Sequence, residues 1–383
     1  MPDRILVVDD EPALELLIRQ KFRRQIRDNE LVFSFAGDGE EALEQLEQNP
    51  DIGIVLTDIN MPRMDGLTLL VKLREFDRVI RAIVVSAYGD LKNIRTAMNR
   101  GAFDFVTKPI DFTDLETTVQ KSIGDLRAYV DAAIAKQQLA AIQKELDVAR
   151  RIQETALPAT FPDDDHVDLY AFMIPAREVG GDFFDFFHFD EDRIGFVIGD
   201  VSGKGVSAAM FMTVSRTLLR ALALREPEPA ACLTQLNHIL YPETVAEMFV
   251  TIFYGVLDKR NGEVTYCNAG HNPPYLLRAD GSVEQVPRTG GIGVCLMREF
   301  EYQSASLKLG DGDILLTFTD GVTEAMNGAG DQYTDERLIE LLSDAHGLTA
   351  NQVMGRLVRS VSNFSDSAPQ SDDITALAIR YTG

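Results

Sequence analysis

The sequence of 383 residues lacks several features that would place it in other protein classes. Its three cysteines, Cys232, Cys267 and Cys295, are odd in number and widely spaced, which argues against disulfides and a zinc site and fits a reducing cytoplasm. No apolar run is long enough for a membrane span, and the N-terminus lacks the basic and apolar regions of a signal peptide. We therefore expect a cytoplasmic protein that does not enter a membrane.

Basic residues are too few to balance the acidic ones. Lys and Arg total 37 against 60 Asp and Glu, and the net charge is -23. Because such a chain repels phosphates, we expect no nucleic acid among its partners, and the absence of a helix-turn-helix pattern further excludes a DNA-binding regulator. The surplus of carboxylates leaves many groups available for metal sites.

Residues 1–124 alternate between short apolar runs and amphipathic segments. The runs at 5–8, 32–35, 54–56, 82–85 and 103–106 predict buried strands, and the segments between them predict helices. Five such repeats predict an α/β fold with a doubly wound, five-stranded parallel sheet. Its functional site should lie at the carboxyl ends of the strands.

Polar residues follow those predicted strands. Asp9 and Asp10 follow the first, Asp58 the third, Ser86 the fourth and Lys108 the fifth. Each one alone would more often be a helix cap or a turn residue. Because they share one rim, the three carboxylates need a hard cation, in practice Mg²⁺, to offset their repulsion. The lysine and the hydroxyl opposite suit a phosphoryl group added to the central carboxylate.

The motifs Asp9-Asp10, Asp58-Ile59-Asn60-Met61-Pro62, Ser86-Ala87 and Lys108-Pro109 resemble those of receiver domains in two-component response regulators. The resemblance covers the whole segment. It implies that Asp58 accepts a phosphoryl group from an upstream histidine kinase or phosphotransfer protein. It also implies one Mg²⁺, held by Asp9, Asp10, Asp58 and the carbonyl of Asn60.

The same resemblance implies roles for three further residues. Lys108 and Ser86 would contact the phosphoryl oxygens. Phe105 stands at the position of the switch aromatic residue, which reorients when Ser86 is drawn to the phosphoryl group. The other interpretation of Phe105 is a core residue at the end of a strand, and the two interpretations are compatible.

Residues 111–157 predict one long helix, with no proline before Pro158 and a capping-box pattern in Thr113 and Glu116. Two apolar stripes at coiled-coil spacing are out of register with each other: Ile123, Leu126 and Val130 form one, and Leu139, Ile142, Leu146 and Ala149 the other. A lone linker helix with an unburied apolar seam would be poorly soluble. We therefore expect residues 125–157 to form a coiled-coil linker in a homodimer.

From residue 158 to 383 the pattern changes to period-two strands with turn signals. Strands are predicted at 169–174, 183–189, 194–198, 250–257, 263–267, 314–319 and 374–379, and helices at 205–224, 230–240, 336–343 and 351–362. This order predicts an α+β domain of antiparallel sheets flanked by helices.

Four aspartates recur at the strand ends of this segment: Asp182, Asp200, Asp320 and Asp372, with Asp373 as the alternative to Asp372. Each one alone is more often a turn residue. Other catalytic candidates are few, since His271 lies in a Gly-His-Asn-Pro-Pro turn without a nucleophile partner. A carboxylate cluster has one obvious use, which is to hold Mg²⁺ or Mn²⁺ so that water becomes a nucleophile near neutral pH.

These motifs, with Gly199-Asp200-Val201-Ser202-Gly203, Asn268-Ala269-Gly270-His271-Asn272-Pro273-Pro274 and Thr319-Asp320-Gly321, resemble the metal-dependent protein phosphatases (protein phosphatase 2C) of the bacterial sporulation stage II E and stress-regulator type. The match runs from about Val148 to the C-terminus. It implies two Mn²⁺ or Mg²⁺ ions bridged by Asp200. Their remaining ligands would be Asp182, Asp320, Asp372 and the carbonyl of Val201.

Two residues are compared with the leaving-group acid and the phosphate-binding arginine of the eukaryotic members. Ser202 stands where the eukaryotic members carry a histidine that protonates the leaving alcohol, so a different acid would have to serve. Arg177 has the spacing of their phosphate-binding arginine, although a plain surface arginine fits equally well.

Together the segments predict a response regulator whose output is a protein serine/threonine phosphatase. By analogy with this family architecture, the substrate would be a phosphorylated anti-sigma-factor antagonist with a STAS fold. The alternative is an adaptor that binds a sigma factor or its regulator without catalysis. Retention of all four aspartates argues against it, because an adaptor has no need to confine so much negative charge.

Overall fold

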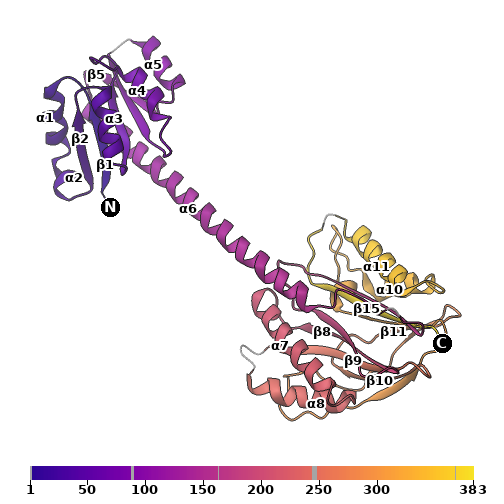
Figure 1. Ribbon diagram of the computed structural model, residues 1–383. Helices are drawn as coiled ribbons and strands as arrows, with labels where there is room; N and C mark the ends of the chain where they lie inside the picture. The colour runs from indigo at the N-terminus through magenta and orange to yellow at the C-terminus, as the bar shows by residue number, and fades with distance from the viewer. Residues whose placement is uncertain (1, 88–89, 163, 244–247, 367) are drawn as a thin grey trace. The chain divides into compact units, whose positions relative to one another are not determined.

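The computed structural model describes residues 2–383 except 88–89, 163, 244–247 and 367. The chain divides into two compact units, Met1–Ala141 and Ile142–Gly383. Helix α6 (Phe112–Ala156) begins in the first unit and ends in the second (Figure 1).

The first unit is built on a parallel sheet of five strands in the order β2-β1-β3-β4-β5, which confirms the predicted doubly wound fold. The strands are β1 (Asp3–Val8), β2 (Leu31–Ala36), β3 (Ile52–Asp58), β4 (Arg81–Ala87) and β5 (Asp104–Lys108). The helices before α6 are α1 (Pro12–Lys21), α2 (Arg23–Arg27), α3 (Gly39–Gln48), α4 (Gly66–Leu73) and α5 (Leu91–Asn99).

Both faces of this sheet are covered, which is why its central strands read as continuous apolar runs. On one face, α1 and the first turns of α6 pack against the sheet through Ile18, Leu115 and Val119. On the other face, α3, α4 and α5 pack through Leu46, Leu69 and other buried residues. Of the polar residues at the carboxyl ends of the strands, Asp10 is exposed, whereas Asp58 and Ser86 are buried.

Helix α6 departs from the prediction at its beginning. The helix begins at Phe112, before Thr113, and the Asp111 carboxylate accepts the N–H of Thr113 at 2.8 Å and that of Asp114 at 3.5 Å. Thr113 therefore lies inside the helix, and the predicted capping box is wrong. An aspartate one residue before the helix can satisfy the same free N–H groups.

The first apolar stripe of α6 belongs to the receiver core and not to a pairing surface. Ile123 is 4% exposed, and Leu126 packs on the same core so closely that a Cβ on Gly53 would lie 2.4 Å from Leu126 Cδ2. The prediction that this stripe forms a seam is therefore wrong for Ile123 and Leu126. The two stripes are out of register because the first one faces the sheet of its own domain.

The second apolar stripe of α6 is partly exposed to solvent. Leu139 and Ile142 are 66% and 54% exposed, whereas Leu146 and Ala149 are half-buried. Pairing through this stripe stays a prediction.

The second unit contains two five-stranded sheets, in the orders β13-β10-β9-β8-β7 and β12-β11-β14-β15-β6. All their pairings are antiparallel, as predicted. The strands are β6 (Val167–Ile174), β7 (Phe183–His188), β8 (Arg193–Val201), β9 (Val250–Asp258), β10 (Glu263–Ala269), β11 (Tyr275–Leu277), β12 (Val283–Gln285), β13 (Ala305–Lys308), β14 (Ile314–Phe318) and β15 (Ile374–Tyr381). The helices are α7 (Val206–Ala223), α8 (Pro229–Leu240), α9 (Asp320–Thr323), α10 (Thr334–Ser343) and α11 (Ala350–Ser365), with a 3-10 turn at Tyr241–Glu243.

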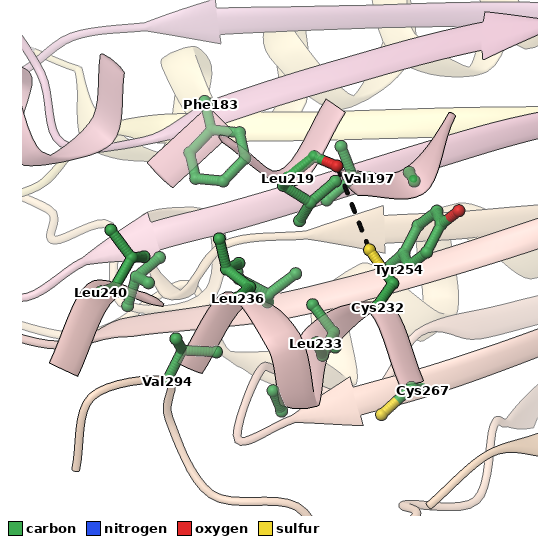
Figure 2. Packing of buried hydrophobic residues seen from close by; sticks show 14 of the residues in the cluster. Phe183, Val197, Leu219, Cys232, Leu233, Leu236, Leu240, Tyr254, Cys267 and Val294 are labelled. Carbon is green, nitrogen blue, oxygen red and sulfur yellow. Dashed lines mark hydrogen bonds between the residues drawn. The ribbon is translucent and has the colours of Figure 1, made fainter. Parts of the chain in front are cut away.

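The two sheets face each other, and helices cover their outer faces (Figure 1). Phe196, Phe253 and Leu315 lie in the core between the sheets. Helices α10 and α11 cover one outer face, and α7 and α8 cover the other. Figure 2 shows this last layer, in which Leu236 and Cys232 of α8 lie among residues of the neighbouring strands. Burial raises the pKa of the Cys232 and Cys267 thiols to about 12, so they pack as apolar groups.

Helix α7 alone, within the described part of the chain, is long and apolar enough by length and hydropathy to cross a membrane. The prediction that no run would pass such a test is wrong for this helix. Core helices of globular proteins share this length and composition. Here Arg216 and Arg220 of α7 pair with the fully buried Asp185 of β7 at 2.9 and 2.7 Å, and Met212 and Leu219 lie in the core.

We predict that Leu236→Ala lowers the free energy of unfolding of the second unit by about 2–5 kcal/mol, because it leaves a cavity in a fully packed layer. In calorimetric unfolding of the whole chain, the transition of the second unit should occur at a lower temperature than in wild type. Ile239→Ala on the same helix is the matched control, since Ile239 is 43% exposed and should have little effect. Equal shifts in the two variants would contradict this account of the core.

Candidate functional site

The carboxyl ends of the parallel strands bring three acidic side chains together. One ligand oxygen each from Asp9, Asp10 and Asp58 lies within 4.8 Å of the others. The N–H of Ile59 donates to Asp58 Oδ1 at 2.7 Å, which orients the carboxylate. Oxygen ligands in this arrangement fit a hard divalent cation such as Mg²⁺.

Lys108 supplies a positive charge to the same cluster. Its Nζ lies 2.9 Å from Asp58 Oδ2 and 3.1 Å from Asp9 Oδ2. Burial lowers the pKa of Lys108, but the hydrogen bonds to Asp58 and Asp9 outweigh it, and the pKa is raised overall. Burial raises the pKa of Asp9 despite its hydrogen bonds to the Glu11 N–H and to Lys108. The ammonium therefore stays charged beside the carboxylates.

The other predicted receiver residues surround this cluster. Ser86 is buried, and its Oγ has no hydrogen-bond partner among the described residues, so it is available to an added phosphoryl oxygen. Phe105 is 37% exposed on β5, beside the strand that carries Ser86. Asn60 is exposed, two residues beyond Asp58. The arrangement agrees with the roles predicted for these residues without testing them.

In the second unit, the four predicted aspartates come from both sheets. Asp182 directly precedes β7, Asp200 lies near the end of β8, Asp320 begins α9 after β14, and Asp372 precedes β15. The hydroxyl of Thr319, at the end of β14, donates to Asp182 Oδ2 at 2.7 Å and so connects the two sheets. The structure thus places the aspartates around one end of the sandwich, as an acidic centre.

Burial and mutual repulsion raise the pKa values of these carboxylates. Burial, with repulsion from Asp320 and Asp372, raises the pKa of Asp200 to about 7, and a hydrogen bond with Asp182 opposes this rise. Burial and repulsion from Asp200 raise the pKa of Asp182 well above its usual range. Burial also raises the pKa of Asp320. Buried acids that repel one another in this way fit a divalent cation, which would stabilise their charged forms.

Asp373 has a different role from Asp372. Its buried carboxylate accepts the N–H of Ala176 at 2.7 Å and of Gly181 at 2.6 Å. A Cβ on Gly180 would lie 2.5 Å from Asp373 Oδ2, so the glycine is required by this close contact. Asp373 is therefore a structural residue, and Asp372 is left as the candidate ligand.

Lys204 was not predicted from the sequence. Its Nζ lies 2.8 Å from Asp372 Oδ2, at the edge of the acidic centre. Among the described residues, only the receiver carboxylates bring three acidic ligand atoms within 4.8 Å of one another. The carboxylates of the acidic centre are thus spaced more widely than those of the first unit, and Asp372 pairs with Lys204. The sequence signal for Lys204 was its place in the Gly203-Lys204-Gly205 loop after Asp200.

Four other predicted or considered residues lie near this centre. A Cβ on Gly205 would lie 3.9 Å from Arg177 Nη1, so Arg177 is beside the loop after Asp200. A Cβ on Gly181 would lie 3.0 Å from the Val201 carbonyl oxygen, so this oxygen faces the Asp182 segment. Ser202 Oγ accepts the N–H of Phe249 at 2.9 Å. His271 is buried, its Nδ1 lies 2.8 Å from Thr251 Oγ1, and burial lowers its pKa to about 4.

Gln153 connects α6 to the acidic centre. Its Nε2 donates to the Gly180 carbonyl at 2.6 Å, and its Oε1 accepts the Gly180 N–H at 3.0 Å. The side chain is buried, although most of the helix between residue 124 and this end is exposed. Gly180 is two residues from Asp182, so the helix end is joined directly to the segment that carries a candidate ligand. Sequence patterns alone could not find this contact, because glutamine is also a common helix surface residue.

Comparison with known proteins agrees with both parts. The family profile for the response regulator receiver domain matches residues 5–120, and that for stage II sporulation protein E (SpoIIE) matches residues 190–382. Protein IcfG of Synechocystis is 32% identical over 262 residues, which are 61% of this chain and 41% of IcfG. Phosphoserine phosphatase RsbU of Bacillus subtilis is 26% identical over 70% of this chain and 79% of its own length.

A solved structure gives the same fold. The SiaA-PP2C domain of Pseudomonas aeruginosa superposes with a TM-score of 0.56 at 21% identity, over 63% of this chain and 98% of that domain. The protein therefore joins a response regulator receiver domain to a domain with the fold of the PP2C phosphatase domains. More specifically, the chain belongs to the SpoIIE family, whose profile covers half of it.

We predict that, in chelator, the second unit loses stability as the pH rises from about 4, the unfolded pKa of an aspartate, to about 7. The folded pKa of Asp200 lies above the unfolded value, so the folded state binds more protons in this window and is favoured at its acidic end. Asp200→Asn removes the titration, so its melting temperature relative to wild type should be higher at pH 8 than at pH 5. A difference that does not change with pH would contradict the raised pKa.

Proposed function

We propose that this protein is a response regulator in which phosphorylation of Asp58 controls a metal-dependent protein phosphatase acting on phosphoserine or phosphothreonine. The observation that carries the proposal is the acidic centre, where Asp182, Asp200, Asp320 and Asp372 come from both sheets. The raised pKa values of Asp182 and Asp200 support it, since an adaptor would gain nothing from this repulsion.

The donor set favours two Mn²⁺ or Mg²⁺ ions in this centre. Asp200 would be a ligand to both ions, and Asp182, Asp320, Asp372 and the Val201 carbonyl would be the other ligands. Such ions lower the pKa of a coordinated water and neutralise phosphate charge. For the receiver we propose one Mg²⁺ held by Asp9, Asp10, Asp58 and the Asn60 carbonyl.

The chain itself would supply substrate positioning. Arg177 stands beside the loop after Asp200, where its guanidinium can bind phosphate oxygens in a bidentate manner. Ser202 uses its hydroxyl to hold Phe249, so it is already engaged. In the receiver, Lys108 and the Ser86 hydroxyl, which has no partner within the described part of the chain, would bind the phosphoryl oxygens on Asp58. Phe105 would follow Ser86.

Relatives guide the choice of partners. RsbU and RsbP of Bacillus subtilis are named phosphoserine phosphatases. We propose a phosphorylated STAS-type anti-sigma-factor antagonist as substrate and a histidine kinase or phosphotransfer protein as phosphodonor. We also propose a receiver at 1–124, a linker at 125–157 and a phosphatase domain at 158–383.

The linker would carry the signal through pairing with its copy in a homodimer. Leu139 and Ile142 are exposed at coiled-coil spacing, and alanines at 128, 132 and 135 continue their heptad toward the receiver. At the other end of the helix, Gln153 holds Gly180 beside Asp182. A change in pairing would therefore reach a candidate ligand through one side chain. A coupling of about 1–3 kcal/mol is enough for regulation.

We predict that Asp200→Asn lowers Mn²⁺-dependent hydrolysis of p-nitrophenyl phosphate at least about 100-fold, because metal ions contribute several kcal/mol to such reactions. The fold should be kept, since asparagine has nearly the same shape. Rates and circular dichroism would be measured together, with Asp192→Asn, a partly exposed acid of the same unit that is not a candidate ligand, as control. Unchanged turnover in Asp200→Asn, or full wild-type activity in excess chelator, would disprove the assignment.

We predict that Leu139→Ser with Ile142→Ser lowers the mass seen by light scattering from dimer to monomer. It should also abolish the change in phosphatase rate after treatment with acetyl phosphate and Mg²⁺, because both side chains lie on the proposed seam.

Gln137→Ser with Gln143→Ser changes exposed residues on other faces of the helix and serves as the matched control. Intact mass should show one phosphoryl group on wild type and none on Asp58→Asn. If the seam variant keeps the wild-type mass and response, the linker is only a spacer.

A further inference from the structure

A cavity of about 270 Å³ in the phosphatase unit has no role in the chemistry described so far. It lies between helix α11 and the adjoining ends of β6 and β15. Its lining is largely apolar and includes Ile174, Ala325, Met326, Val358, Val361 and Ile374. We call it the α11 pocket.

The pocket shares its wall with the acidic centre. Gly321 and Ser371 line it, and each is the immediate neighbour of a candidate ligand, Asp320 or Asp372. Neighbouring Cα atoms are about 3.8 Å apart. Gln370, another lining residue, donates to the carbonyls of Ile174 at 2.8 Å and Asp372 at 2.7 Å. A group bound at the aspartates therefore has this pocket beside it.

The chemistry of the pocket contrasts with that of its surroundings. Ile174 and Met326 are 38% and 42% exposed at its edge, although the protein is strongly acidic. The volume lies below the roughly 300–1,000 Å³ of most small-molecule sites. It suits a single large apolar side chain better than a separate ligand.

We propose that the α11 pocket receives an apolar side chain of the phosphoprotein substrate, close in sequence or in space to its phosphorylated residue. This rests on the proposed phosphatase function and adds a specificity site to it. The phosphoryl group would lie at the acidic centre, and the neighbouring side chain would cover the exposed edges of Ile174 and Met326. A small aryl phosphate has no such side chain, so its hydrolysis does not depend on the pocket.

The test compares two kinds of substrate in the full chain with Mn²⁺. One is p-nitrophenyl phosphate, and the other is a set of phosphoserine peptides in which one leucine occupies each position within four residues of the phosphoserine. Ser362 lines the pocket from an exposed position on α11, so Ser362→Phe should fill it without disturbing the core. Asn363→Phe, also exposed on α11 and outside this lining, is the matched control.

In wild type, leucine at one or two positions should raise kcat/KM about 10-fold, in keeping with burial of a side chain in an apolar pocket. Ser362→Phe should abolish that preference and leave the aryl phosphate rate within about 2-fold, whereas Asn363→Phe should keep both. Met326→Gln, which adds no bulk, should weaken the preference as well. Thermal unfolding would confirm that the variants are folded.

No leucine preference in wild type, or an undiminished preference in Ser362→Phe, would overturn the proposal while aryl phosphate turnover still supported the phosphatase. Absence of that turnover in wild type would overturn both. A change in mass of Ser362→Phe by light scattering would assign the pocket to a second copy of the chain, and this too would overturn it.

Discussion

The buried carboxylate of Asp373 is the interaction on which the acidic centre depends. It binds N–H groups of the segment before β7 while its own strand, β15, lies in the other sheet. A Cβ at Gly180 would collide with this carboxylate, and a Cβ at Gly321 would collide with the backbone carbonyl of Asp373. Three candidate ligands, Asp182, Asp320 and Asp372, lie within two residues of these contacts. A charge that is fully hydrogen-bonded by backbone thus holds together several charges that repel one another.

The two acidic sites differ in how the repulsion among their carboxylates is offset. In the receiver, Lys108 lies against Asp9 and Asp58, so a fixed positive charge accompanies a compact group of carboxylates. In the phosphatase domain, Lys204 pairs with Asp372 and also donates to the carbonyl of Ser371, and the deeper Asp182 and Asp200 have raised pKa values. In the proposed function, the receiver site would take one added phosphoryl group, whereas the phosphatase centre would admit the phosphorylated residue of another protein.

Much of the fold and of both sites could be predicted, because strand ends are marked by the change from apolar to polar residues. Asp58 and Asp200 were found in this way. The partner of an apolar stripe could not be predicted, because Ile123 and Leu126 have the same spacing whether they face another helix or their own sheet. Nor could the pattern separate Asp372 from Asp373, since only the fold shows which carboxylate turns toward backbone N–H groups.

The two hydrogen bonds from Gln153 to Gly180 have a consequence for how input domains can be exchanged in this architecture. They fix which face of α6 meets the phosphatase, and each residue added to or removed from the exposed part of the helix turns the far end by about 100°. Seven residues, or two turns, nearly restore the original direction, whereas two or five residues reverse it. Helical phase, more than linker length, then decides which receivers or other sensors can be joined to this catalytic domain.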